Sequence, residues 1–235
     1  AFAAAPQITQ VKFKAAGNSP KIAVYFDQAV HASGTIGAAD FTLSGASSTG
    51  NSIANVAANQ IGTIFVLTLA GPTSNVNPQA TGKWLIAASS SLKNIGNESA
   101  NTSAVDLNGN GDGTAPSVIG VFQHGIQSLD VMFSEEADSQ TAVATSSYIN
   151  LTTIAVGDTP TTTSRQIVPE QNFVILTVGA STTLGWGNGN SLDVGSVQDL
   201  VGNPLAATST YTILPPIKIG EVKAESSVNT QDEFI

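Results

Sequence analysis

Hydrophobic and polar residues alternate along several short stretches of the chain. Between Ile22 and Phe26, the residues Ile, Val and Phe occupy every second position, with Ala and Tyr between them. The stretch from Ser128 to Phe133 repeats the pattern with Leu, Val and Phe. A period of two residues places alternate side chains on one face of a strand. Each stretch therefore predicts a strand that buries one face.

Two other runs, Ile64 to Leu69 and Phe173 to Val178, are short, mostly hydrophobic and rich in β-branched or aromatic residues. These features favour central strands. Single helical turns are expected only at Ala38 to Phe41 and at Thr145 to Tyr148, where Ser, Asp or Thr can cap a turn. Turn-forming Gly, Asn and Pro recur roughly every 8 to 12 residues, a spacing typical of a β-sandwich.

The chain also repeats itself, because four blocks recur in the same order at offsets of 106 to 109 residues. The matched pairs are Phe26 with Phe133, Phe41 with Tyr148, Phe65 with Val174, and Leu92 to Asn97 with Gln198 to Asn203. Such a repeat indicates two copies of one folding unit. We therefore predict an all-β protein made of two tandem Greek-key β-sandwiches of about 105 residues each.

The boundaries follow from composition. Gly, Asn and Asp crowd the segment between the copies, and a proline pair ends the second copy. We predict a flexible N-terminus (1–5), a first sandwich (6–105), a linker (106–115), a second sandwich (116–214) and an extended C-terminal segment (215–235). That last segment is either a strand or the start of a truncated third domain.

Charge and composition exclude several classes of protein. The 235 residues include no cysteine, which excludes a disulfide framework and cysteine-ligated metals. Hydrophobic residues make up 41% and charged residues 11%, so disorder is not expected. The net charge of -9 disfavours nucleic-acid binding. No stretch reaches the length of about 18 apolar residues that a membrane helix needs, so no membrane insertion is expected.

The N-terminal residues 1–6 carry the small-residue pattern found around signal-peptidase sites. This pattern predicts a secreted or extracellular protein located at the cell surface, although an alanine-rich loose terminus has the same appearance.

Some motifs resemble a known family. Phe133-Ser134-Glu135-Glu136 and the segment from Asp199 to Leu205 are similar to strand ends and turns of tandem bacterial Ig-like domains, which occur in S-layer and other cell-surface proteins. The resemblance covers about residues 6 to 214. It implies Ig-like sandwiches that serve as spacers, lattice units or adhesive stalks, with self-association or neighbouring surface proteins as partners.

The C-terminal tail resembles a different domain. Ile217 to Val222 and Asp232 to Ile235 look like the first strands of a lamin-tail domain. An extended segment without an in-chain sheet can add to the sheet edge of a neighbouring molecule. We therefore expect the tail to support assembly by strand addition.

One spacing suggests a metal. Oxygen-bearing side chains stand at alternate positions, with Gly111 where a calcium loop turns; they are Asp106, Asn108, Asn110 and Asp112. Position 12 holds Ser117 instead of glutamate. We predict either a weak calcium site, with a dissociation constant on the order of 10⁻⁴ to 10⁻³ M, or a solvated linker without metal.

The sequence offers no nucleophile with a base, no cofactor loop and no histidine cluster, so the protein is not expected to be an enzyme. Glu135, Glu136 and Asp138 are expected to solvate a strand end. Trp84 and Trp186 occur late in the two copies. They predict either core packing or sugar stacking, and the second reading makes an adhesion or carbohydrate-binding module the alternative function.

Overall fold

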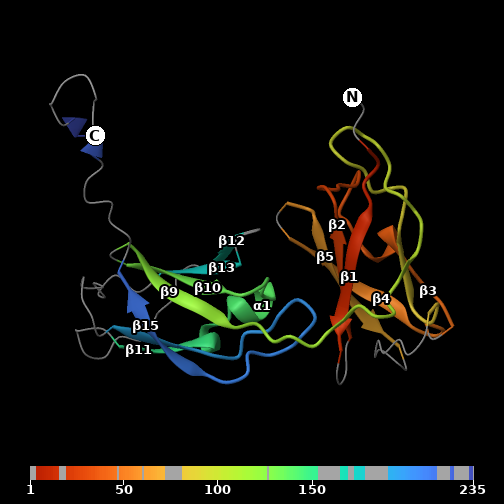
Figure 1. The fold of residues 1–235 in the computed structure, drawn as a ribbon. Helices are drawn as coiled ribbons and strands as arrows, with labels where there is room; N and C mark the ends of the chain where they lie inside the picture. The colour runs from red at the N-terminus through yellow and green to blue at the C-terminus, as the bar shows by residue number, and fades with distance from the viewer. Residues whose placement is uncertain are drawn as a thin grey trace.

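The computed structural model is almost entirely β-structure, and its strands form two modules that lie side by side (Figure 1). It describes residues 4–15, 20–46, 48–59, 61–71, 81–125, 127–152, 165–168, 172–177, 190–215, 223–224 and 233–234. Trp186 and most of the N-terminal and C-terminal segments named above lie outside these ranges. Within them, no helix has the length and hydrophobicity to cross a membrane.

The first module contains eight strands and one short 3₁₀ turn. They are β1 (Ile8–Lys14), β2 (Lys21–Phe26), η1 (Ala38–Asp40), β3 (Phe41–Ser44), β4 (Ser52–Ala58), β5 (Ile64–Ala70), β6 (Leu85–Ala88), β7 (Val105–Asp106) and β8 (Gly111–Asp112). One sheet has the order β4-β5-β2-β1-β8, and the other has the order β3-β6-β7.

The second module repeats this plan. Its elements are β9 (Val118–Gly125), β10 (Ser128–Phe133), α1 (Ser139–Ala142), η2 (Thr145–Ser147), β11 (Tyr148–Thr152), β12 (Arg165–Val168), β13 (Phe173–Thr177), β14 (Ser191–Val194) and β15 (Ser209–Leu214). The strand order is β11-β14-β15-β9-β10-β13-β12. Farther on, β16 (Lys223–Ala224) pairs with β17 (Glu233–Phe234).

Part of the expected linker is the last strand of the first module. In the second module, β15 pairs with both β14 and β9, and its pairing with β9 is parallel. In the first module, β7 pairs with β6, and β8 pairs in parallel with β1. A turn at Gly109, whose φ is +80°, separates β7 from β8. Residues 105–112 thus pair with two neighbouring strands through two short strands, whereas β15 makes both pairings as one strand. Residues 113–117 connect the modules.

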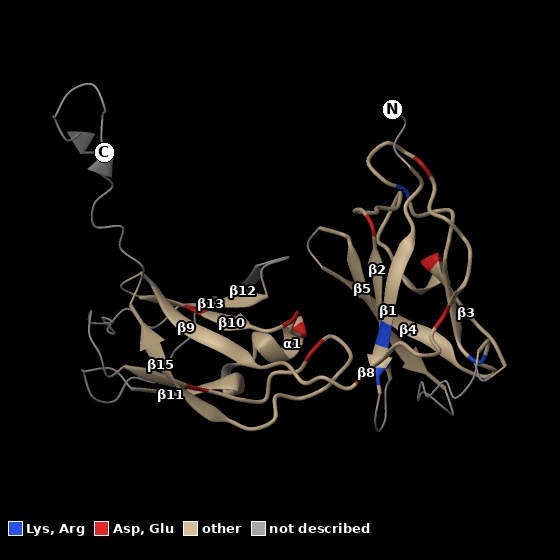
Figure 2. Ribbon diagram, viewed as in Figure 1, with Lys and Arg blue, Asp and Glu red and all other residues tan. Residues whose placement is uncertain are grey.

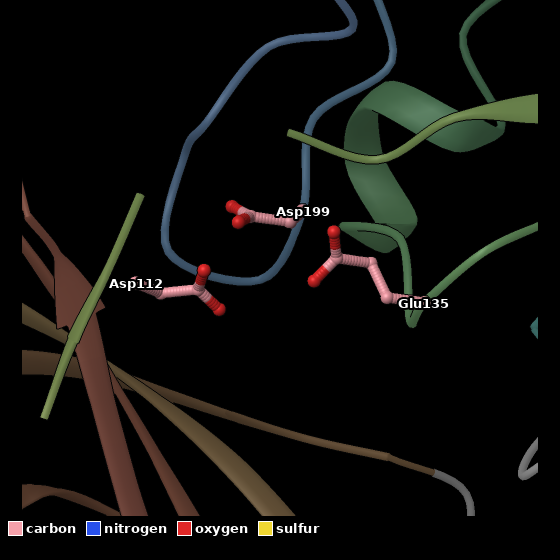
Figure 3. Close-up of side chains that lie close together, drawn as sticks. All are labelled: Asp112, Glu135 and Asp199. Atoms are coloured by element: carbon pink, nitrogen blue, oxygen red, sulfur yellow. The ribbon is translucent and has the colours of Figure 1, made fainter. Parts of the chain in front are cut away.

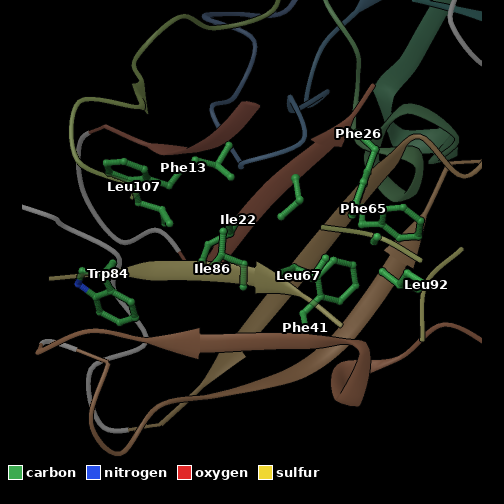
Figure 4. Packing of buried hydrophobic residues seen from close by; sticks show 14 of the residues in the cluster. Phe13, Ile22, Phe26, Phe41, Phe65, Leu67, Trp84, Ile86, Leu92 and Leu107 are labelled. Carbon is green, nitrogen blue, oxygen red and sulfur yellow. The ribbon is translucent and has the colours of Figure 1, made fainter. Parts of the chain in front are cut away.

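Each module has its own hydrophobic core. The first includes Phe26, Phe65 and Leu67, with the rings of Phe26 and Phe65 packed edge to face at 5.7 Å between centroids. Figure 4 shows these side chains meeting between the two sheets. The second core includes Phe133 and Leu176. In β10 the buried positions alternate as the sequence predicts, whereas in β2 the residue Ala23 is buried together with Ile22, Val24 and Phe26. The strands confirm the expected all-β sandwich class.

The loop that follows the sixth strand of each module also repeats, but at an offset of 105 instead of near 106. In the first module, Asn94 accepts a hydrogen bond through its side chain from the backbone N–H of Glu98. In the second, Asp199 accepts one in the same way from Asn203. The left-handed residue of the first loop is Asn97, and that of the second is Gly202. The hydrogen bonds and backbone conformations of the two turns therefore match at an offset of 105, one residue less than the offset in the sequence comparison.

Candidate functional site

Several charged side chains from both modules lie at the joint between them. Figure 2 shows basic positions on β1 beside β8, at the side of the first module that faces the second. Both ion pairs found among the described residues involve this region, Lys12 with Asp112 and Lys21 with Asp138. We therefore treat the joint as the candidate functional site.

The four predicted calcium ligands lie along the end of the first module. The carboxylate of Asp106 accepts hydrogen bonds from the backbone N–H groups of Gly82 at 2.7 Å and Asn108 at 2.9 Å. The side-chain amide of Asn110 donates to the backbone oxygens of Asp106 and Asn108. These bonds shape the turn between β7 and β8. The calcium site stays a prediction.

Asp112, the last of the four, faces the joint. Its Oδ2 lies 2.9 Å from Nζ of Lys12, and its Oδ1 accepts a hydrogen bond from the backbone N–H of Thr114. Its backbone oxygen accepts a hydrogen bond at 3.0 Å from the side chain of Asn203, which belongs to the second module. Asp112 therefore connects β1 with a loop that follows β14.

Asp112 also belongs to a group of three carboxylates, with Glu135 and Asp199. One carboxylate oxygen of each lies within 4.8 Å of the others, and the three side chains point toward one another (Figure 3). Asp199 is buried, and its carboxylate accepts hydrogen bonds from the backbone of Val201 and from the backbone and side chain of Asn203. Carboxylate oxygens are the ligand type that calcium prefers, and Lys12 provides positive charge to this group.

The proximity of these carboxylates affects titration. Burial raises the pKa of Glu135, and the negative charges of Asp112 and Asp199 raise it further. Its Oε1 atom is buried without a hydrogen-bond partner. Burial opposes the charged form of Lys12, but the hydrogen bond and charge of Asp112 outweigh it, so the pKa of Lys12 is raised. The group thus favours the charged form of Lys12 and opposes ionisation of Glu135.

Other contacts cross the joint directly. Nζ of Lys14 donates to the backbone oxygen of Gly202 at 3.1 Å. Nζ of Lys21 lies 2.8 Å from Oδ2 of Asp138, whose Oδ1 caps α1 by accepting from two backbone N–H groups. Burial and the charge of Glu136 raise the pKa of Tyr25, so its phenol stays protonated and hydrogen-bonds to Glu136. The expectation that the acidic residues 135, 136 and 138 solvate a strand end is wrong, because they face the first module.

A cavity of about 530 Å³ opens beside these contacts, between the modules. Its lining residues are Tyr25, Phe26, Asp27, Thr63, Ile64, Ser134, Glu135, Glu136 and Asn172. They supply carboxylates, hydroxyls, an amide and two aromatic rings. Such groups can hydrogen-bond a polar ligand.

The sugar-stacking interpretation of the tryptophans does not hold for Trp84. Only 2% of Trp84 is exposed, and it packs in the first core, so its ring is not available to a ligand. The sequence patterns did not identify Lys12, Lys14 and Lys21 as residues of the joint. The scarcity of basic residues in the chain, and their concentration in the first two strands, could have pointed to them.

Comparisons with known proteins gave structural likeness only. No family profile and no curated protein matches the sequence. A crystal structure of the S-layer protein SbsC (31–844) matches 95% of this chain at 13% identity and a TM-score of 0.41, and a structure of SbsC domains 1–6 matches 96% at 14% and 0.43. The chain spans 27% of each. FdeC, an Escherichia coli adhesin, matches 88% of this chain at 14% identity and a TM-score of 0.25, over 63% of its own length. These likenesses concern the all-β fold alone.

Proposed function

We propose that this chain is a non-catalytic structural module of a bacterial surface layer, fibre or stalk, secreted and located at the cell surface. The observation that carries the proposal is the architecture, in which two separately packed sandwiches are connected by several polar contacts at the joint. This arrangement suits a spacer. Two lysines at the joint pair with carboxylates, which supports a structural role.

Assembly by strand addition through the C-terminal tail is part of this proposal. The described residues of the tail pair with one another, Lys223 with Phe234 and Ala224 with Glu233. Among the residues that the structure describes, each of these strands pairs only with the other, so its outer edge can accept a strand of a neighbouring sheet. Partners would then be other copies of the chain or neighbouring surface proteins, and head-to-tail contacts would produce a filament or lattice.

Sedimentation velocity tests this assembly. We expect the full chain to form larger species as its concentration increases, and a chain that lacks residues 216–235 to sediment as a monomer at the same concentrations. If the shortened chain assembles as well as the full chain, strand addition by the tail is wrong. If neither chain assembles at any concentration, the structural proposal itself loses its support.

Adhesion, with a carbohydrate as the partner, is the second candidate function. The cavity at the joint favours it, since carboxylates, hydroxyls and an amide can bond to sugar hydroxyl groups. A glycan array tests the idea with the full chain and with the Asp27→Asn and Asn172→Ala variants. Binding that both variants reduce supports this function, and an array without binding contradicts it.

A further inference from the structure

The joint uses a large share of the few basic residues in the chain. Of eight Lys and Arg residues, three lie here. Of 17 acidic residues, five lie here, namely Asp112, Glu135, Glu136, Asp138 and Asp199. Scarce charges concentrated at one place indicate a specific use, because an ordinary protein surface spreads them evenly.

The internal repeat shows that the sandwich itself does not require these groups. At an offset of 107, the position of Lys21 is occupied in the second module by Ser128, and that of Tyr25 by Met132. Both pairs sit in matching strands, β2 and β10. The second module folds with the same strand order without an ammonium or a phenol at these places. Lys21 and Tyr25 therefore serve the joint.

The contacts are spread over several elements on each side. The first module contributes Lys14 from β1 and Lys21 from β2, and the second contributes Asp138 at the start of α1 and Gly202 in a loop. The covalent connection between β8 and β9 is the short segment 113–117. A single short covalent connection lets the two modules rotate relative to each other, whereas contacts between several separate elements prevent that rotation.

The burial of the ion pair strengthens this argument. The side chain of Asp138 is 9% exposed and that of Lys21 is 24% exposed. Fully exposed pairs contribute little, because water and salt screen them. A pair that is largely shielded from water, and whose carboxylate is also fixed by capping a helix, has a defined geometry.

We propose that the joint is a lock, in which Lys14 and Lys21 hold the second module in one orientation through Gly202 and Asp138. Without these two lysines the modules remain folded, and the contacts left at the joint, Asn203 with Asp112 and Tyr25 with Glu136, are too few to fix one orientation about residues 113–117. The tandem pair is then one rigid body in its native state, and its stiffness comes from these contacts instead of from the linker. This inference goes beyond the proposed function and does not depend on assembly.

Distances between spin labels, measured by pulsed electron paramagnetic resonance on the dilute full chain, test the lock. The chain has no cysteine, so Ile95→Cys and Thr212→Cys place one label on each module without other modifications. Ile95 is 99% exposed and Thr212 is also exposed. We expect a single narrow distance peak from this labelled chain.

The variants decide the outcome. Lys14→Met with Lys21→Met keeps the long apolar stems and removes the charges, and we expect the narrow peak to be lost. Asp138→Asn tests the other side, because asparagine also caps helices, and we expect the peak to broaden. Lys93→Met is the matched control, since Nζ of Lys93 contacts the side chain of Asn97 in an exposed loop, and it should keep the narrow peak.

Two results would overturn the lock. The first is a broad distribution in the labelled chain with all lysines present. The second is a narrow peak that persists unchanged in the Lys14→Met, Lys21→Met variant. Circular dichroism of each variant at the temperature of the measurement confirms that both sandwiches stay folded, so that loss of the peak reports the joint alone.

Discussion

The separate cores predict that destabilising one module leaves the other largely intact. Leu67 in β5 and Leu176 in β13 align in the internal repeat and are fully buried, each in its own core. Truncation of a buried leucine to alanine costs about 2–5 kcal/mol, from lost burial and from the cavity that remains. At roughly 4–8 °C per kcal/mol for a domain of this size, a loss of about 3 kcal/mol lowers the melting temperature by roughly 12–24 °C.

Tryptophan fluorescence assigns each transition to a module. The chain has two tryptophans, so in a Trp186→Phe background the signal comes from Trp84, which is buried in the first core. Leu67→Ala should lower the melting temperature of the Trp84 transition by the full decrease of roughly 12–24 °C. Leu176→Ala should lower a calorimetric transition of the second module and shift the Trp84 transition by less than about 1 kcal/mol, since distant sites act almost independently.

If Leu176→Ala lowers the Trp84 transition as much as Leu67→Ala does, the chain unfolds as one cooperative unit. The two cores would then be a single thermodynamic domain, despite their separate packing.

Three further predictions concern single sites. Glu135→Gln should raise the melting temperature at pH 7, because the pKa of Glu135 is raised in the folded protein. The stability of the wild type falls as pH rises through that pKa. In a pH series of thermal unfolding, the advantage of the variant should therefore shrink toward pH 4. Gly45→Ala should destabilise the first module, because φ at Gly45 is +103° and a Cβ there would lie 2.6 Å from the backbone oxygen of Gly82; chemical denaturation measures the loss, and unchanged stability would argue against this turn. If the predicted loop binds calcium with a dissociation constant of about 1 mM, calcium at about 10 mM should add roughly 1.4 kcal/mol of stability, and the Asp106→Asn variant should lose this gain; titration calorimetry that detects no heat would exclude the site.

Much of the fold could be predicted from local patterns. The alternation around Val24 and Val131 gave two central strands, and the repeat of Phe26 with Phe133 gave the two modules. Local patterns failed at residues 106–115, where a composition typical of linkers hides the last strand of the first module. Its two pieces are two residues long each and pair with β6 and β1, which lie far from them in the sequence or in the other sheet.

The joint could not be predicted in the same way. Its partners lie far apart in the sequence, 100 residues for Lys12 with Asp112 and 117 residues for Lys21 with Asp138. Neither periodicity nor motif spacing carries information about such pairs. The pairing of β1 with β8 sets the first pair, and the relative orientation of the two modules sets the second. The short helix α1 was not predicted, because its capping residue, Asp138, was interpreted as a solvated charge at a strand end.

Electron microscopy of the purified chain in negative stain is the most direct examination of the structural role. We expect ordered arrays or filaments whose repeating unit has the dimensions of two sandwiches. A field of dispersed single particles at every concentration and salt condition would contradict that role.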